Sequence, residues 1–299
     1  MRRLLSVLPF TLLILGSFSH AQEAEFSLLP TEIEPGLVML EAAAGCGGCT
    51  MVLVIGEDGV VLIDDGIQPY SDLIMPAVEK FTKRPVDYVI NTHIHGDHTG
   101  SNTTMHEHGA TIVGHENIRD RMLAVGMRSA SGTRPAEPHE IPQITFSDEM
   151  TFHLNGYTVH IIHPVGAHTD GDGFIHFPDI NVIHTGDIYF NGIFPFIDLD
   201  SGGTVDGYLA AQAQILGMAD DDTRIVPGHG SLSDRAGMQA AHDMLTDANA
   251  RVKALLASGK SADEILVENP LADYHDEWSW AFITTERMTE TLIRGNTSQ

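Results

Sequence analysis

The sequence has few cysteines, few basic residues and almost no long apolar runs. Only two cysteines occur among its 299 residues, which excludes a structural zinc site built from four thiolates. Lysine and arginine total 16 against 41 aspartates and glutamates, so the formal net charge is −25. Nucleic acids and anionic membranes bind through lysine and arginine. The composition therefore argues against a nucleic-acid partner and leaves a small molecule as the expected one.

The single long apolar run stands at the N-terminus. Two arginines precede a mostly apolar stretch over residues 4–18, and Ser19-His20-Ala21 ends it with the small-x-small pattern of a cleavage site. The run is short for a membrane span, although an uncleaved anchor is an alternative. We expect residues 1–21 to be a signal peptide and residues 22–299 to form one domain. That domain would be periplasmic or secreted, with no stable membrane association; its oligomeric state is left open.

The two cysteines stand close together, at Cys46 and Cys49. In an oxidising compartment such a pair can form a small disulfide loop, and a redox pair or a metal clip are the alternatives. A thioredoxin-like redox motif would be followed by a βαβ pattern, but the next residues read as a hairpin. A structural disulfide, or two free thiols, is therefore favoured.

Alternating and helical apolar patterns indicate two β-rich halves interleaved with helices. Strands are expected over 38–40, 51–55, 60–63, 86–90, 111–113, 144–146, 150–154, 157–163, 174–177, 182–184 and 224–226. Helices are expected over 70–81, 97–108, 117–125, 205–217, 234–258 and 279–293. Residues 126–140 read as a loop. This pattern favours an α/β protein in which two sheets pack face to face beneath outer helices.

Four metal-binding side chains occur within six residues, in His93-Ile94-His95-Gly96-Asp97-His98. The segment follows an apolar strand, where alternation points His93 and His95 the same way. Gly96 allows an abrupt turn, after which Asp97 and His98 stand at the expected helix start. Imidazole and carboxylate together suit zinc, with iron or manganese as alternatives. The segment therefore predicts a metal site.

The pattern His-x-His-x-Asp-His resembles the signature of the metallo-β-lactamase fold superfamily, which includes β-lactamases, glyoxalase II and lactonases. Further ligands expected in that family have counterparts here in His168, Asp187 and His229. The resemblance runs from about residue 51 to at least residue 258. It implies a four-layer αββα sandwich of two mixed sheets flanked by helices.

The resemblance also implies two metal positions bridged by Asp187. The first would be held by three histidines: His93, His95 and His168. The second would be held by one carboxylate and two histidines: Asp97, His98 and His229. Two zinc ions are the expected cofactors, and Asp97 would also orient the attacking hydroxide.

The implied activity is hydrolysis of an amide, ester, lactone or thioester carbonyl by a metal-bound hydroxide. An aspartate at position 187, rather than a cysteine, favours a glyoxalase II-like or lactonase-like pattern, while β-lactamase activity stays among the candidates. The expected C-terminal helices carry only scattered basic residues, which argues against a glutathione site. Two alternatives are an iron-dependent sulfur (persulfide) dioxygenase and a non-catalytic metal-binding accessory of a periplasmic oxidation system.

Several side chains near the expected ligands are candidates for supporting roles. An aromatic run follows Asp187, and in it Tyr189 or Asn191 could donate a hydrogen bond to the oxyanion of a tetrahedral intermediate. The alternative is that these aromatic residues close the core. His163 and His184 are each expected either to support a ligand or simply to be packed and hydrogen-bonded.

Overall fold

The computed structural model describes residues 27–43, 49–129 and 132–297. The expected signal peptide and Cys46 lie outside these residues. Cys49 is disulfide-bonded, as in the first of the two alternatives favoured by the sequence. Among the described helices, none has the length and apolar character needed to cross a membrane.

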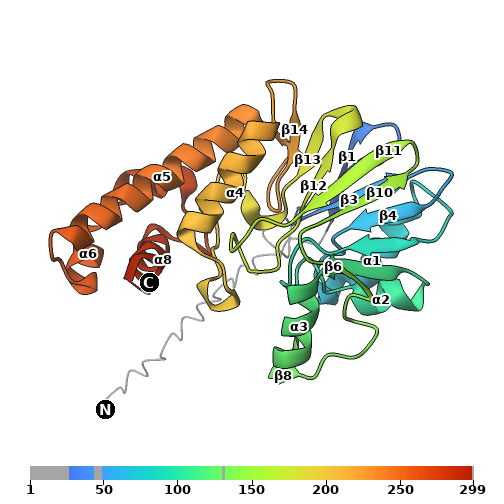
Figure 1. The fold of residues 1–299 in the computed structure, drawn as a ribbon, viewed down its shortest axis with the longest axis horizontal. Helices are drawn as coiled ribbons and strands as arrows, with labels where there is room; N and C mark the ends of the chain where they lie inside the picture. Colours follow the sequence, from blue (N-terminus) through green and yellow to red (C-terminus); the bar gives the residue numbers. More distant parts are fainter. Residues whose placement is uncertain (1–26, 44–48, 130–131, 298–299) are drawn as a thin grey trace, which may run out of the picture.

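Two mixed sheets form the centre of the fold (Figure 1). The first has seven strands, ordered β1 (Leu28–Glu34), β2 (Leu37–Ala42), β3 (Thr50–Ile55), β4 (Val60–Ile63), β5 (Tyr88–Ile90), β6 (Thr111–His115) and β9 (Ile144–Phe146). The second has six, ordered β10 (Glu149–Leu154), β11 (Tyr157–Ile162), β12 (Phe174–Phe177), β13 (Val182–His184), β14 (Arg224–Val226) and β15 (Ser233–Asp234). The pairings β4–β5, β5–β6, β6–β9 and β13–β14 are parallel, and the others are antiparallel.

Helices cover the outer face of each sheet, on opposite sides of the molecule (Figure 1). The first sheet carries α1 (Ser71–Val78), α2 (Asn102–Glu107) and α3 (Glu116–Val125). Beside the second lie α4 (Val205–Met218) and α5 (Arg235–Ala257), followed along the chain by α6 (Ala262–Glu268), α7 (His275–Trp278) and α8 (Thr285–Thr297). Of these last helices, α6 and α8 pack against α5. The expected four-layer αββα sandwich is therefore confirmed.

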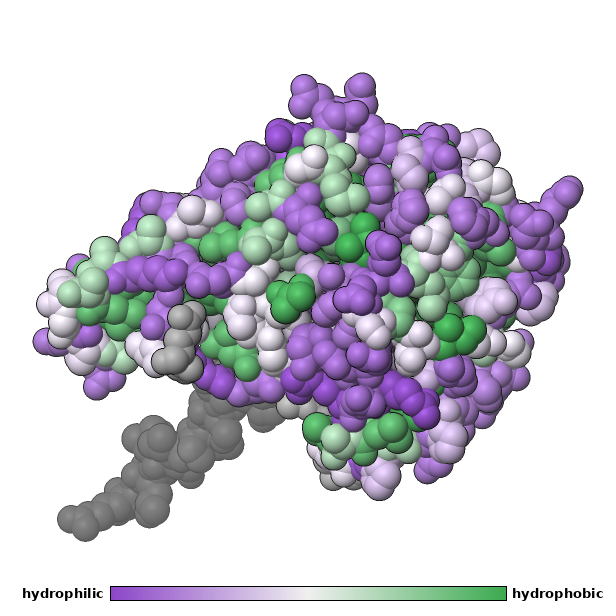
Figure 2. Space-filling model, in the orientation of Figure 1, coloured by the Kyte–Doolittle hydropathy of each residue, from purple (hydrophilic) through white to green (hydrophobic). Residues whose placement is uncertain are grey.

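Alternating side chains build three apolar layers. In β3, Val52 and Val54 face Ile175 and Phe177 of the second sheet, whereas Leu53 faces the helix side with Ile74 of α1 and other residues. A third layer joins the second sheet to α4, α5 and α8. Strands buried on both faces read as continuous apolar runs, as these do. The viewed surface is largely hydrophilic with scattered apolar patches (Figure 2).

Three expected elements were wrong in part. The helix expected over 97–108 begins only at Asn102. The motif first forms a turn, in which the His98 carbonyl accepts a hydrogen bond from the side-chain amide of Asn91. The expected loop over 126–140 contains a hairpin of β7 (Met127–Ser129) and β8 (Gly132–Arg134).

The helix expected over 279–293 begins only at Thr285. The residues before it are held by the loop that follows Asp187: the Phe194 amide donates to the Trp278 carbonyl at 2.7 Å. In return, Trp280 Nε1 donates to the Phe194 carbonyl at 2.9 Å. These tertiary hydrogen bonds outweigh the weak local helix preference.

Candidate metal centre

The motif is held in place by a buried aspartate at the end of β4. Asp64, with a φ of 58°, accepts hydrogen bonds from the Thr92 amide at 2.7 Å and the Thr92 hydroxyl at 2.8 Å. It also accepts one from His98 Nδ1 at 2.7 Å. A carboxylate on one ring nitrogen fixes the tautomer and the orientation of the imidazole. Nε2 of His98 is therefore left as the nitrogen facing the other donors.

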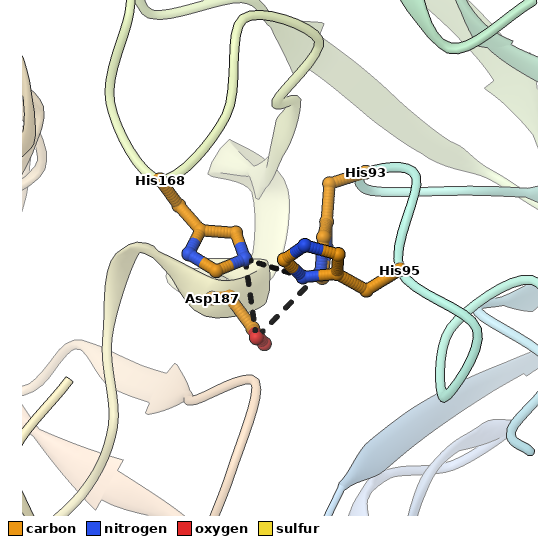
Figure 3. A group of neighbouring side chains, drawn as sticks. All are labelled: His93, His95, His168 and Asp187. Atoms are coloured by element: carbon orange, nitrogen blue, oxygen red, sulfur yellow. Dashed lines mark hydrogen bonds and ion pairs between the residues drawn. The ribbon is translucent and has the colours of Figure 1, made fainter. Parts of the chain in front are cut away.

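The first donor group combines His93, His95, His168 and Asp187 (Figure 3). The two N-terminal histidines follow β5, His168 lies in the loop after β11, and Asp187 lies in the short 3-10 helix Gly186–Ile188 after β13. Nδ1 of His95 is 3.2 Å from Nε2 of His93 and 2.9 Å from Nε2 of His168. The three ring nitrogens therefore converge on one point beside the carboxylate.

The second group combines Asp97, His98 and His229, the last of which follows β14. Asp97 Oδ2 is 3.4 Å from Nε2 of His229. Asp187 lies between the groups: its Oδ2 is 3.5 Å from Nε2 of His168 and 3.4 Å from Nε2 of His229. The structure thus brings together all seven predicted ligands.

Two buried polar atoms show that this arrangement suits a cation. Nε2 of His98 and Oδ1 of Asp187 lie 3.2 Å apart, yet neither has a hydrogen-bond partner. Orphaned buried donors and acceptors are costly, and a bound cation would satisfy both. A Cβ on Gly228 would come within 2.1 Å of Asp187 Oδ1, so a glycine keeps this position open. Imidazole and carboxylate donors in one cluster suit a divalent metal.

The rings of the first group are oriented by hydrogen bonds on their far side. Nε2 of His95 donates to Asp198 Oδ2 at 2.9 Å, and Nδ1 of His168 donates to the Phe196 carbonyl at 2.7 Å. Burial opposes ionisation of Asp198, but the hydrogen bonds from His95 and Ser201 hold its pKa well below the ordinary value. Such partners fix ligand orientation. No sequence pattern around Asp198 predicted this role.

Charges within the cluster oppose the effect of burial on the pKa values of its histidines and aspartates. Burial favours the neutral forms, yet nearby Asp187, Asp64 and Asp97 raise the pKa of His98 well above its ordinary value. In the same way, Asp187 and Asp97 raise the pKa of His229 to about 9 against burial. Burial likewise opposes ionisation of Asp187, but the neighbouring histidines keep its pKa low. Without metal, the cluster holds its acidic groups as carboxylates and binds protons on at least two histidines.

Metal loading is therefore expected to release protons. A ligating histidine must be neutral, whereas His229, with a pKa of about 9, and His98 are protonated near pH 7. Zinc binding at pH 7 should expel about two protons, and affinity should fall as the pH falls below about 9. Calorimetric zinc titrations in buffers of different ionisation enthalpy measure the number released. A result of no protons released would contradict the expectation.

Tyr189 and Asn191 form a hydrogen-bonded unit beside the cluster. The Tyr189 side chain is fully buried; its hydroxyl donates to Asn191 Oδ1 at 2.8 Å and lies 2.8 Å from Ser233 Oγ. Burial raises the pKa of Tyr189 to about 12. The Asn191 amide donates to the Ser231 carbonyl at 3.0 Å. Because these groups are engaged within the protein, the geometry supports a packing role, and the oxyanion role stays a prediction.

Tyr189→Phe is expected to lower stability more than activity. The substitution removes a buried hydroxyl and leaves Ser233 and Asn191 each short of one partner, at a cost of about 1–2 kcal/mol in the free energy of unfolding. Turnover should stay within about threefold of the parent. Denaturant unfolding and steady-state kinetics measure the two effects. A fall in turnover of a hundredfold or more at unchanged metal content would instead support the oxyanion role.

His163 and His184, the two candidates for supporting roles, are packed and hydrogen-bonded. His163 stacks on His115 with ring centroids 3.9 Å apart, and its Nδ1 is 2.7 Å from the Asp172 carbonyl. Nδ1 of His184 accepts from the Gly186 amide at 3.0 Å. His184 thus holds the turn that carries Asp187 rather than bonding the carboxylate itself.

Aromatic side chains surround the histidines on the side of the second sheet. Phe190 stacks on His229 with centroids 4.7 Å apart, and Phe196 stacks on His95 at 5.6 Å. Trp280 lies 6.4 Å from the His229 ring. The aromatic run after Asp187 therefore both lines the cluster and closes the core, where Phe194 is fully buried. Trp280 reaches the cluster from the C-terminal region and was not among the predicted site residues.

Two mixed sheets under outer helices, with histidines and aspartates gathered at strand ends, define an αββα protein with a candidate divalent-metal centre. The chain matches the model of the metallo-beta-lactamase superfamily over residues 44–229, more than half its length. It belongs to this superfamily.

Two individual relatives share 28% and 26% sequence identity with this chain. The chain is 28% identical to a probable metallo-hydrolase of Methanocaldococcus jannaschii over 196 residues, covering 63% of this chain and 91% of the relative. It is 26% identical to the alpha subunit of a 2,4-dinitroanisole O-demethylase of a Nocardioides species, covering 58% of this chain and 50% of the relative.

Solved structures support the fold. A metallo-beta-lactamase from Pontibacter korlensis superposes with a TM-score of 0.59 at 19% identity, covering 74% of this chain and 99% of that one. The sec-alkylsulfatase Pisa1 from a Pseudomonas species superposes with a TM-score of 0.68 at 15% identity, covering 89% of this chain and 50% of that one.

Proposed function

We propose that this protein is an exported, dinuclear metal-dependent hydrolase that cleaves an amide, ester, lactone or thioester carbonyl of a small molecule. The observation that carries the proposal is the position of Asp187, whose carboxylate faces both donor groups at once. Membership of a superfamily whose relatives include a probable metallo-hydrolase supports the reaction class. Two zinc ions are the proposed cofactors, with iron or manganese as alternatives.

In this proposal the seven ligands divide between two cations. His93, His95 and His168 would hold one cation, Asp97, His98 and His229 the other, and Asp187 would bridge them. Bound divalent cations supply Lewis acidity and lower the pKa of water.

We assign Asp97 the orientation of the attacking water. Its side chain is 25% exposed, so it is the open-sided carboxylate of the cluster. Burial opposes its ionisation, but His98 and His229 lower the pKa of Asp97 to about 2. At neutral pH it is therefore a carboxylate that can accept a hydrogen bond from a water molecule and orient it.

Metal analysis combined with hydrolysis assays tests this function. The mature protein, residues 22–299, would be measured by mass spectrometry for metal content and assayed with a chromogenic cephalosporin and an acyl lactone. About two zinc ions per chain with chelator-sensitive turnover is the expected result. Absence of bound metal after supply of zinc would overturn the proposal.

A second candidate rests on the first donor group, His93, His95, His168 and Asp187, since imidazole and carboxylate ligands also suit iron. An iron-dependent sulfur (persulfide) dioxygenase would contain about one iron per chain and consume oxygen with a persulfide, without hydrolysing either carbonyl substrate. That combined result would replace the first proposal.

Export of the protein can be tested separately from its activity. Expression of the full chain in a Gram-negative host, followed by fractionation and N-terminal sequencing, should place the protein in the periplasm with Gln22 as its first residue. Retention of residues 1–21 in the cytoplasmic fraction would contradict export.

A further inference from the structure

A group of four side chains, three of them from the C-terminal region, stands next to the first donor group and is not used by the proposed chemistry. We call it the C-terminal wall: Phe196, Trp280, Phe282 and Arg287. Phe196 stacks on the ligand His95 and meets the Phe282 ring at a centroid distance of 5.4 Å. The Trp280 ring meets Phe282 in turn at 5.5 Å. The wall therefore runs outward from a candidate ligand as a continuous aromatic surface.

Phe282 is placed to meet a ligand rather than the core. Its side chain is 44% exposed, although it belongs to a segment fixed by the hydrogen bonds of Trp278 and Trp280 to the Phe194 backbone. A large apolar ring held rigidly beside a candidate active centre loses little freedom when it binds an apolar group. The wall thus offers a preformed apolar contact.

Arg287 closes the outer end of the wall. Its guanidinium carbon lies 4.0 Å from the Phe282 ring centroid and 5.4 Å from that of Phe196, in cation–π contact with both. Nη1 donates to the Phe282 carbonyl at 2.8 Å. The side chain is therefore held in one position by two rings and one hydrogen bond.

The charge of Arg287 is not neutralised by a carboxylate. Within the described part of the chain, no aspartate or glutamate oxygen lies within 4.0 Å of its nitrogens, whereas Arg294 of the same helix pairs with Asp200. In a protein with a net charge of −25, a positioned and unpaired arginine provides a local attraction for an anion. The remaining donors, Nε and Nη2, can serve a planar carboxylate in the fork geometry that arginine favours.

We propose that the C-terminal wall selects substrates in which an apolar group carries a carboxylate. The apolar part, an aryl ring or short alkyl chain, would pack on Phe282 and Trp280, and the carboxylate would pair with Arg287. The scissile carbonyl would then lie on the metal side of Phe196. This assignment rests on the proposed hydrolase function and narrows its substrates to amphiphilic organic acids bearing an ester, lactone, amide or thioester bond.

Binding of a non-hydrolysable pair tests the wall separately from catalysis. The probes are 4-phenylbutyrate and the neutral alcohol 4-phenylbutan-1-ol, titrated calorimetrically into the zinc-loaded mature protein; a preference for the anion that came from the metal would persist in Arg287→Met. We expect the anion to bind about tenfold more tightly than the alcohol. Arg287→Met should abolish that preference, and Arg294→Met, in the same helix, should retain it.

Catalysis supplies the second measurement. With the zinc-loaded protein, an aryl ester carrying a carboxylate should be cleaved with a lower KM than its neutral methyl-capped counterpart, and Arg287→Met should raise that KM about tenfold with little change in kcat. Two results would overturn the proposed role of the wall even if hydrolysis is found. The first is equal affinity of the parent for the two probes, and the second is the same preference for the anion in Arg287→Met as in Arg294→Met. If the parent prefers the anion, Arg287→Met alone loses that preference and no substrate is hydrolysed, the role of the wall is supported. Only the hydrolase proposal is then contradicted.

Discussion

Asp187→Asn should reduce hydrolysis by at least about a thousandfold. The asparagine keeps the size of the side chain but loses the negative charge that faces both donor groups, with Oδ2 3.5 Å from Nε2 of His168 and 3.4 Å from Nε2 of His229. Removing a charged ligand weakens metal binding and the chemistry that depends on it. Metal content by mass spectrometry and kcat/KM for whichever substrate the parent cleaves measure the effect.

Asp273→Asn is the matched control for this substitution. Asp273 is an exposed aspartate paired with Arg251, and exposed pairs contribute little to stability, so the control should keep the metal content and the activity of the parent. Parent-like activity in Asp187→Asn would refute the role of Asp187 as the shared ligand.

Chelation should lower the thermal unfolding midpoint by about 10–20 °C. A ligand that binds only the folded state stabilises it by about 4 kcal/mol per site at a thousandfold excess over its dissociation constant, and each kcal/mol corresponds to roughly 2 °C for a chain of this size. Removal of metal also leaves Nε2 of His98 and Oδ1 of Asp187 buried without hydrogen-bond partners. Differential scanning calorimetry before and after treatment with a chelator measures the shift.

Two further measurements make the chelation experiment specific. Adding zinc back should restore the original midpoint, and Asp187→Asn should already unfold near the chelated midpoint and respond little to the chelator. An unchanged midpoint in protein shown by mass spectrometry to have lost its metal would contradict the stabilising role.

The parts of the site that could be predicted are those encoded locally. The alternation of a strand places His93 and His95 on one side, and the following turn brings Asp97 and His98 to the same end. His168, Asp187 and His229 were reached through the family resemblance, because nothing in local periodicity links positions so far apart.

The parts that were missed depend on tertiary contacts. Asp198 orients His95 across 103 positions of sequence, and Trp280 comes to the cluster because its indole bonds the backbone of Phe194. One missed element did have a local signal. Ser261 and Glu264 form a capping box at the start of α6, and a serine followed three residues later by glutamate is a recognised helix start.

The division of the donors between the two sheets has a practical consequence. His93, His95, Asp97 and His98 come from the first sheet, and His168, Asp187 and His229 come from the second. A cut in the chain between β9 and β10 would separate the sheets and leave neither fragment with a complete donor group. The two fragments, mixed in solution, should reassociate more strongly with zinc than without it, so that a split form of this fold would act as a metal-responsive reporter.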